Sequence, residues 1–279
     1  MAVVVVTDSS SRLERDDLQR WGIRQVPLHV LVDGTDLRDG IDPVPYDVHD
    51  RAHVTTAGAA PADLTEAYRK ALADSGGDGV VAVHLSAALS STFSSAVATA
   101  REFGPAVRVV NARSAAAGVG FVAVAAARSA AAGEDLDTVE AAARSAVPRG
   151  RAFIVVHRLD NLRRSGRIGT AASWLGTALS LKPLLCLDVD GRLVLSQRIR
   201  TSSKAHAAMI DAVVEFVGDH AASVVVHHVD NHDDADELGA ALTARLPQLE
   251  SLTVSDMGPV LSIHVGGGAI GVCVTVDGS

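Results

Sequence analysis

A group of hydroxyl side chains follows a short apolar run in the first third of the chain. Val80–Val83 predicts a buried strand, and apolar residues from 93 to 100 recur at helical spacing. Between these segments lie the hydroxyls of Ser86, Ser90, Ser91 and Thr92. A helix start with such hydroxyls favours an anion, either a carboxylate or a phosphate. Helix capping is the alternative, but one cap needs one hydroxyl and three stand in a row here.

A second polar group follows the first apolar run. Val3–Val6 predicts a strand, and Thr7, Asp8 and three serines come directly after it. Open α/β sheets place their ligands at the carboxyl ends of strands. In the alternative interpretation, Asp8 or one of the serines caps a helix from about residue 12 to residue 21. The sequence leaves both roles open.

Two basic residues in the second half are further candidates for ligand or partner contacts. His264 is predicted to end a strand, Val260–His264, at a glycine-rich turn. It would donate a hydrogen bond to a bound carboxylate if it faced the serine-rich turn, and a structural histidine is the alternative. Six arginines crowd residues 149–167, and Arg167 stands out because small and apolar neighbours place it near packed backbone. This group is either a solvated surface or a basic edge that meets an acidic or phosphorylated partner.

Several catalytic and cofactor patterns are incomplete. The glycines of residues 266–271 fit G-x-G-x-x-G, but the β-branched residues after them predict a strand instead of the helix that a pyrophosphate needs. Histidines and aspartates crowd residues 227–234 at a spacing that matches no named metal site, and His227 and His228 alternate across a predicted strand. The sequence contains no P-loop and no G-x-S-x-G elbow. We therefore expect no catalytic residue, no metal and no cofactor.

The order of the predicted elements divides the chain into two parts. Strands alternate with helices over the first 147 residues, which predicts a doubly wound parallel sheet. The second part contains a predicted hairpin at 182–197, a helix at 171–179 around Trp174, and three β runs near the end. We predict an α/β fold with an N-terminal parallel domain at 1–148 and a C-terminal α+β domain at 149–279, whose sheet is largely antiparallel.

Composition narrows the class of protein. The chain has 279 residues, of which 48 % are apolar and 21 % are charged, as in globular proteins. The net charge of -8 argues against nonspecific nucleic-acid binding. Cys186 and Cys273 lie in apolar runs and are expected to be buried thiols in a reducing compartment. We find no signal-peptide pattern and no integral membrane segment, and we expect a cytoplasmic protein.

Seven segments are individually weak signals but are specific in their order and spacing: Thr7-Asp8-Ser9, Val26-Pro27-Leu28, Asp39-Gly40-Ile41-Asp42, residues 85–96, residues 164–168, Leu181-Lys182-Pro183, and residues 264–269. As a set they resemble the DegV family of bacterial fatty-acid-binding proteins over nearly the whole chain. The chain departs from the family pattern at Ser91, where the family has glycine. It also has Ala57-Gly58-Ala59 where the family has Gln-Pro-Ser.

The resemblance implies a carrier and not a catalyst. A long-chain fatty acid would lie in an apolar tunnel between two domains, with its carboxylate on hydroxyls of the first domain. The implied ligand-binding residues are Thr55, Thr56, Ser90, Ser91, Thr92, His264 and Gly266. In relatives, the bound acid is presented to a separate ATP-dependent fatty-acid kinase for phospholipid synthesis. Arg167 would dock this kinase or steady the acyl phosphate.

Two other functions remain open from the sequence. The first is an enzyme that acts on a small carboxylate or phosphate at the serine-rich turn. The second is a signalling or regulatory protein whose ligand only stabilises it. Because we find no activated nucleophile, metal set or nucleotide fingerprint, the residues favour lipid binding over the enzyme.

Overall fold

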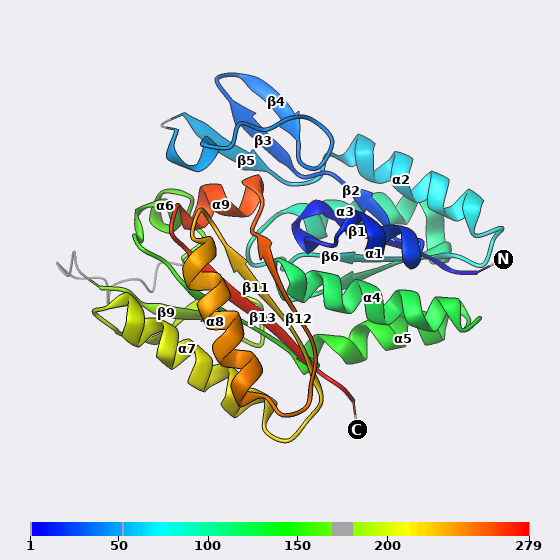
Figure 1. Ribbon diagram of the computed structural model, residues 1–279. Helices are drawn as coiled ribbons and strands as arrows, with labels where there is room; N and C mark the ends of the chain where they lie inside the picture. Colours follow the sequence, from blue (N-terminus) through cyan, green and yellow to red (C-terminus); the bar gives the residue numbers. More distant parts are fainter. Residues whose placement is uncertain (1, 52, 169–180, 279) are drawn as a thin grey trace. The chain divides into compact units, whose positions relative to one another are not determined.

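The computed structural model describes residues 2–51, 53–168 and 181–278. Contacts divide the chain into two compact units (Figure 1). The first unit comprises Met1–Pro45 and His53–Pro148, and the second comprises Tyr46–Ala52 and Arg149–Ser279. Residues 46–52 thus pack with the second unit although they precede it in the chain. The domain limits 1–148 and 149–279 stay a prediction.

The first unit contains the predicted parallel sheet. Its strand order is β2-β1-β6-β7, with every neighbouring pair parallel. The strands are β1 (Val4–Asp8), β2 (Arg24–Val26), β6 (Val80–His84) and β7 (Val107–Asn111). Every residue of β6 is buried, as expected for a strand covered on both faces. The doubly wound parallel arrangement is therefore confirmed.

Helices cover both faces of this sheet (Figure 1). One face carries α2 (Pro61–Asp74) and α3 (Thr92–Ala100), and the other carries α4 (Ala117–Ala131) and α5 (Leu136–Ala146). A short helix α1 (Arg15–Arg20) follows the 3-10 turn η1 (Ser9–Ser11), and a second 3-10 turn, η3 (Arg101–Ala106), follows α3. Helix α4 approaches η1 closely because Gly120 has no side chain: a Cβ atom there would lie 2.9 Å from the Ser11 carbonyl oxygen.

A second, smaller sheet in the first unit was not predicted. It is antiparallel, with the order β4-β3-β5, and consists of β3 (His29–Val32), β4 (Thr35–Arg38) and β5 (Val54–Ala57). The prediction of one strand over residues 26–32 was wrong. Pro27 interrupts it, because proline has no N–H group to donate to a neighbouring strand. The predicted turn at Asp33-Gly34 is confirmed, and both residues have positive φ.

The second unit contains a six-stranded sheet with the order β10-β9-β8-β13-β11-β12, in which β11 and β12 are the parallel pair. The largely antiparallel sheet is therefore confirmed. Its strands are β8 (Gly150–Val155), β9 (Leu184–Leu187), β10 (Leu193–Gln197), β11 (Ala222–His228), β12 (Leu249–Asp256) and β13 (Ile270–Val276). Strands β9 and β10 form the predicted hairpin.

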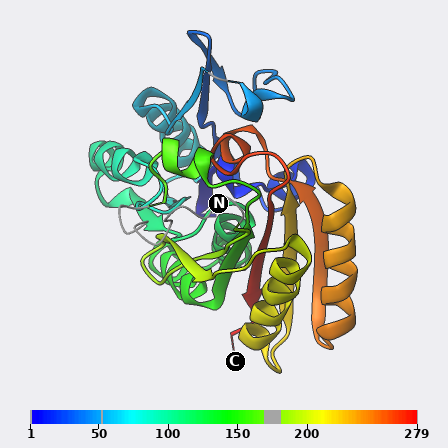
Figure 2. The same cartoon turned by 90° about the vertical axis from the view of Figure 1, so that its left-hand side faces the viewer.

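Two long helices, α7 (Ser202–Val217) and α8 (His232–Arg245), pack along this sheet (Figure 2). Met209 and Val213 of α7 and Leu242 of α8 are buried in the same apolar core as Val272 of β13. The shorter elements are η4 (Val147–Arg149), α6 (Asp160–Arg164), α9 (Pro259–Val265) and η2 (Val48–Asp50). The predicted helix at 171–179 around Trp174 lies outside the described residues.

The predicted strand at Val260–His264 was wrong, because this segment belongs to helix α9. Pro259 occupies the first turn, where its fixed φ suits a helix. Gly258 and Gly266 flank the helix with φ of 78° and 80°. Short apolar runs do not distinguish a buried strand from a buried helix. The glycine match at 266–271 nevertheless leads into a strand, β13, which begins at Ile270, as the sequence predicted.

Both cysteines carry free thiols, Cys273 buried and Cys186 half-buried. The prediction of a buried thiol is therefore confirmed for Cys273, whereas Cys186 is only partly buried. Burial raises the pKa of the Cys186 thiol. In the described parts of the chain, no helix is long and apolar enough to cross a membrane.

Candidate functional site

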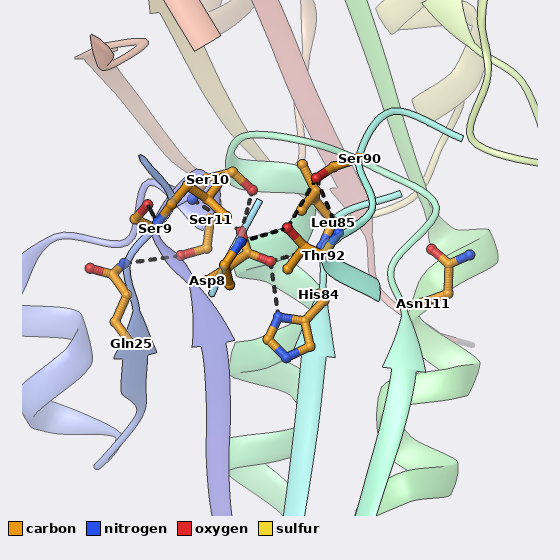
Figure 3. A network of polar contacts seen from close by, with 12 residues as sticks. Asp8, Ser9, Ser10, Ser11, Gln25, His84, Leu85, Ser90, Thr92 and Asn111 are labelled. Atoms are coloured by element: carbon orange, nitrogen blue, oxygen red, sulfur yellow. Dashed lines mark hydrogen bonds and ion pairs between the residues drawn. The ribbon is translucent and has the colours of Figure 1, made fainter. Parts of the chain in front are cut away.

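Asp8 lies at the centre of a buried polar network at the carboxyl end of the parallel sheet (Figure 3). Its side chain is 0 % exposed. One carboxylate oxygen accepts hydrogen bonds from the N–H group of Ser10, at 3.1 Å, and from the Ser10 hydroxyl. The other accepts from Nδ1 of His84 and from the N–H group of Leu85, both at 3.0 Å. Asp8 therefore joins the ends of β1 and β6.

These contacts favour the capping role that the sequence left open for Asp8. Asp8 caps the 3-10 turn η1, whereas the predicted helix at 12–21 is the shorter α1. In the same turn, the Ser9 hydroxyl accepts a hydrogen bond from the N–H group of Leu28 at 3.0 Å. The carboxylate and the first serine hydroxyl thus hold the turn together within the protein.

His84 continues the network into helix α2. Its Nε2 atom lies 2.9 Å from the hydroxyl of Tyr68, and both side chains are fully buried. Burial, assisted by the charge of Asp8, raises the pKa of Tyr68, so the phenol keeps its proton. The consistent assignment is that Tyr68 donates to Nε2 while the Nδ1–H group donates to Asp8. An aspartate and a histidine in this order form part of a catalytic triad, but a tyrosine stands here where the triad has its serine.

The serine-rich turn of residues 86–91 leads into helix α3. The Ser90 hydroxyl oxygen accepts from the N–H group of Thr92 at 3.2 Å and lies 3.0 Å from the Thr92 hydroxyl. The Thr92 hydroxyl in turn accepts from the N–H group of Ala59 at 3.1 Å. Either of these two hydroxyls can donate to the other, because each hydroxyl oxygen has two lone pairs. Thr92 is buried, Ser90 is partly buried and Ser91 is exposed, so Ser90 and Ser91 carry the accessible hydroxyls of this turn.

Thr55 and Thr56 lie next to each other on β5 and therefore point to opposite faces of its sheet. Thr55 pairs with Leu31 and is exposed, whereas Thr56 pairs with Val30 and is partly buried. A ligand on one face of this sheet therefore meets only one of the two hydroxyls.

Three predicted residues lie in the second unit. His264 is in the last turn of α9, and Gly266 ends that helix next to Asn161 of α6. Burial, followed by the positive charge of Arg167, lowers the pKa of His264 to about 4. Arg167 donates a hydrogen bond to the carbonyl oxygen of Ser165. The structure therefore brings His264 close to Arg167.

Comparison with known proteins decides the family. A sequence model described as "Uncharacterised protein, DegV family" matches residues 2–277. The chain belongs to the DegV family. A DegV domain-containing protein of Mycobacterium tuberculosis is 62 % identical over 279 residues, which cover 100 % of this chain and 99 % of that protein.

Solved DegV structures have the same fold. A DegV family protein from Thermus thermophilus, described by its fatty-acid binding, superposes with a TM-score of 0.92 at 31 % identity and covers 99 % of this chain and 100 % of its own. DegV from Bacillus subtilis, described as a fatty acid binding protein, has a TM-score of 0.88 at 26 % identity, with 99 % and 100 % of the two chains covered.

Two departures from the DegV pattern lie in contact with each other. A Cβ atom on Gly58 would lie 2.7 Å from the Thr92 hydroxyl oxygen and 3.2 Å from that of Ser91. Gly58 therefore packs directly against Thr92 and Ser91. The corner between β5 and α2 packs on the serine-rich turn because residue 58 is glycine.

The histidines and aspartates of residues 227–234 are distributed over separate contacts. Asp230 lies 3.1 Å from Nε2 of His49, His232 lies 3.0 Å from Asp236, and His227 lies 3.0 Å from the Ser255 hydroxyl. Across the described ranges, no three His, Cys, Asp or Glu side chains form a group that could hold a metal ion.

Sequence reasoning missed Tyr68, His84 and Ala59. The one available signal was His84, a polar residue at the end of an otherwise apolar strand. Such a residue needs a buried partner, because an unsatisfied polar group in the core is costly. Its partners lie 16 and 76 residues away in the chain, which no local pattern reveals.

We expect Tyr68→Phe to lower the free energy of unfolding by about 1–3 kcal/mol, because it leaves Nε2 of His84 buried without a donor. Urea denaturation measures this change. Tyr46→Phe is the matched control, since Tyr46 is 78 % exposed and should lose almost nothing. Equal midpoints for the two variants would show that the buried hydroxyl contributes no stability.

We expect His264 to make the protein less stable in acid. Its folded pKa of about 4 lies below the ordinary 6.5, so the unfolded chain binds the proton more tightly. The contribution of neutral His264 to the free energy of unfolding is complete above about pH 6.5, and it is lost as the pH falls toward about 4. Thermal melts at both ends of this range should show a smaller loss for His264→Gln than for the wild type. His53→Gln, at an exposed position, is the control, and the prediction fails if both variants follow the wild type.

Proposed function

We propose that this chain binds a long-chain fatty acid and presents it, chemically unchanged, to a separate ATP-dependent fatty-acid kinase. The observation that carries the proposal is the start of helix α3, where the Ser90 hydroxyl is only partly buried and the exposed Ser91, the cap residue, makes no side-chain hydrogen bond to the helix. The solved relatives described as fatty-acid-binding proteins support the choice of ligand.

The carboxylate of the acid would sit at the start of α3. This helix has nine residues, and Ser91 at its cap makes no side-chain hydrogen bond to the helix. Backbone N–H groups at a helix start stabilise a negative charge. Ser90 and Ser91 would contact the carboxylate, while the buried Thr92 would act through Ser90.

The other predicted ligand-binding residues lie on strand β5 and at the end of helix α9. One of Thr55 and Thr56 would add a hydroxyl, and His264 and Gly266 would contribute from the second unit. The place of the acyl chain between the two domains is carried over from the resemblance alone. We also propose a cytoplasmic location, a role in phospholipid synthesis and no cofactor besides the bound acid.

The contacts favour a carrier over an enzyme acting on a small carboxylate or phosphate at the same turn. Such an enzyme needs an activated nucleophile or base near the ligand. The buried pair of Asp8 and His84 contacts Tyr68 through Nε2 of His84. The His84 ring points away from Ser90 (Figure 3). His264, with a pKa of about 4, is a weak proton acceptor at neutral pH.

Native mass spectrometry of the purified protein, followed by lipid extraction, tests the proposal directly. We expect one fatty acid per chain. A ligand-free mass that does not shift when oleate is added would overturn fatty-acid binding and would favour the enzyme.

We expect Ser90→Ala to weaken oleate binding by about 1–3 kcal/mol, because the carboxylate loses one hydrogen-bond donor. Titration calorimetry measures the affinity. Ser145→Ala removes an exposed hydroxyl on α5, whose partner is the Ala142 carbonyl, and should bind oleate like the wild type. Unchanged affinity in Ser90→Ala would remove Ser90 from the site.

We expect Arg167→Ala to bind oleate normally. We also expect the kinase to form acyl phosphate from this variant about tenfold more slowly, which corresponds to an activation free energy raised by about 1.4 kcal/mol. Arg158→Ala is the control, because Arg158 is highly exposed and already paired with Asp160. A loss of oleate affinity in Arg167→Ala would place this arginine in the ligand site instead.

A further inference from the structure

Asn231 stands at the N-terminus of helix α8 but does not cap it. An asparagine at this position usually accepts a hydrogen bond from an N–H group of the first helical turn. Here the side chain makes no such bond. Its Nδ2 amide group instead donates to Oδ2 of Asp234 at 3.0 Å and to the carbonyl oxygen of Gly268 at 3.2 Å. Carboxylate and carbonyl oxygens accept hydrogen bonds, so the two hydrogens of this amide group fit both partners.

This amide group links the first turn of α8 to the glycine turn, residues 266–268, which leads from α9 into β13. Two backbone hydrogen bonds reinforce the link. The N–H group of Gly268 donates to the Val229 carbonyl at 2.8 Å, and the N–H group of Val229 donates to the Ala269 carbonyl at 3.0 Å. Asn231 supplies the contact that a substitution can remove without changing the backbone of the turn.

The glycine turn packs closely against two histidine rings. A Cβ atom on Gly267 would lie 3.2 Å from Nε2 of His49, and one on Gly268 would collide with the ring of His157. A shift of the turn toward either ring is therefore blocked by packing. The hydrogen bond from Asn231 to the Gly268 carbonyl opposes a shift away from α8.

We propose that Asn231 is a positioning residue for ligand binding, whose amide group fixes the glycine turn and with it Gly266 and the end of α9 that carries His264. The proposal rests on the proposed function, in which these two residues contact the fatty acid. Gly266 joins the turn to the helix, because its N–H group donates to the Ser262 carbonyl of α9 at 2.7 Å. A turn that is already held in place loses little freedom when a ligand binds, and affinity rises by that saving.

Asn231→Ser separates positioning from stability. Serine caps a helix about as well as asparagine, but its short side chain has no amide group to donate to Gly268. Asn231 and Gly268 are both partly buried, so water can replace the lost donor. We expect an unchanged melting temperature and an oleate affinity about fivefold weaker by titration calorimetry, at the low end of the range for coupled sites. Unchanged affinity overturns the proposal, and so does a melting temperature that falls in proportion to the affinity.

Asn231→Gly is a second variant that removes the amide group without adding a charge. Glycine is also tolerated at a helix N-cap, and we expect the same loss of oleate affinity as in Asn231→Ser. Gln248→Ser is the matched control, because exposed Gln248, between α8 and β12, uses its amide group to donate to the Asp219 carbonyl at 2.8 Å. This control should bind oleate like the wild type. An equal loss in Gln248→Ser would contradict a specific role for Asn231.

A ligand-free measurement separates failure of this inference from failure of the proposed function. Hydrogen exchange of the Gly268 amide should be about tenfold faster in Asn231→Ser, because the turn opens more often, while the buried amide of Val224 in β11 exchanges unchanged. Unchanged exchange at Gly268 overturns the positioning role, even if oleate binds. If the wild type binds no oleate, the proposed function fails, while the exchange still decides whether Asn231 fixes the turn.

Discussion

The buried carboxylate of Asp8 is the interaction on which the rest of the first unit depends. A carboxylate removed from water must receive hydrogen bonds from the protein, because an uncompensated buried charge is strongly destabilising. Here the donors come from two turns, with Ser10 after β1 and Leu85 and His84 at the end of β6. Satisfying one charge thus fixes the ends of two neighbouring strands together. The serine-rich turn begins directly at this fixed point.

Hydrogen bonds within the protein hold the serine-rich turn in place. The Ala59 N–H group donates to the Thr92 hydroxyl, and the Thr92 hydroxyl and N–H group both contact the Ser90 hydroxyl. The turn is therefore tied to the corner between β5 and α2. The close approach requires Gly58, since any side chain there would collide with the Thr92 hydroxyl.

Local sequence patterns predicted the elements whose residues form continuous apolar runs. They failed where an element or a site depends on contacts between residues that are far apart in the chain. The run Val80–Val83 is buried throughout, and it predicted β6 and the parallel sheet. Strand β4 has the sequence TDLR, which carries no apolar alternation, so its sheet was missed. Ser90 could be singled out from its neighbours in sequence. The contact that holds its partner Thr92 could not, because it comes from Ala59, which lies 33 residues before Thr92.

The ionisable groups around the candidate residues are occupied by contacts within the protein or are weak bases. Asp8 has its acceptor sites filled, and His84 is directed at a tyrosine that keeps its proton. His264, kept neutral by burial and by Arg167, is a poor base at neutral pH. Catalysis of acyl chemistry needs a nucleophile activated by a base, and here the bases are occupied or weak. Hydroxyl and amide donors remain, and such donors recognise a carboxylate and leave it intact, which supports a carrier that depends on a separate enzyme for its chemistry.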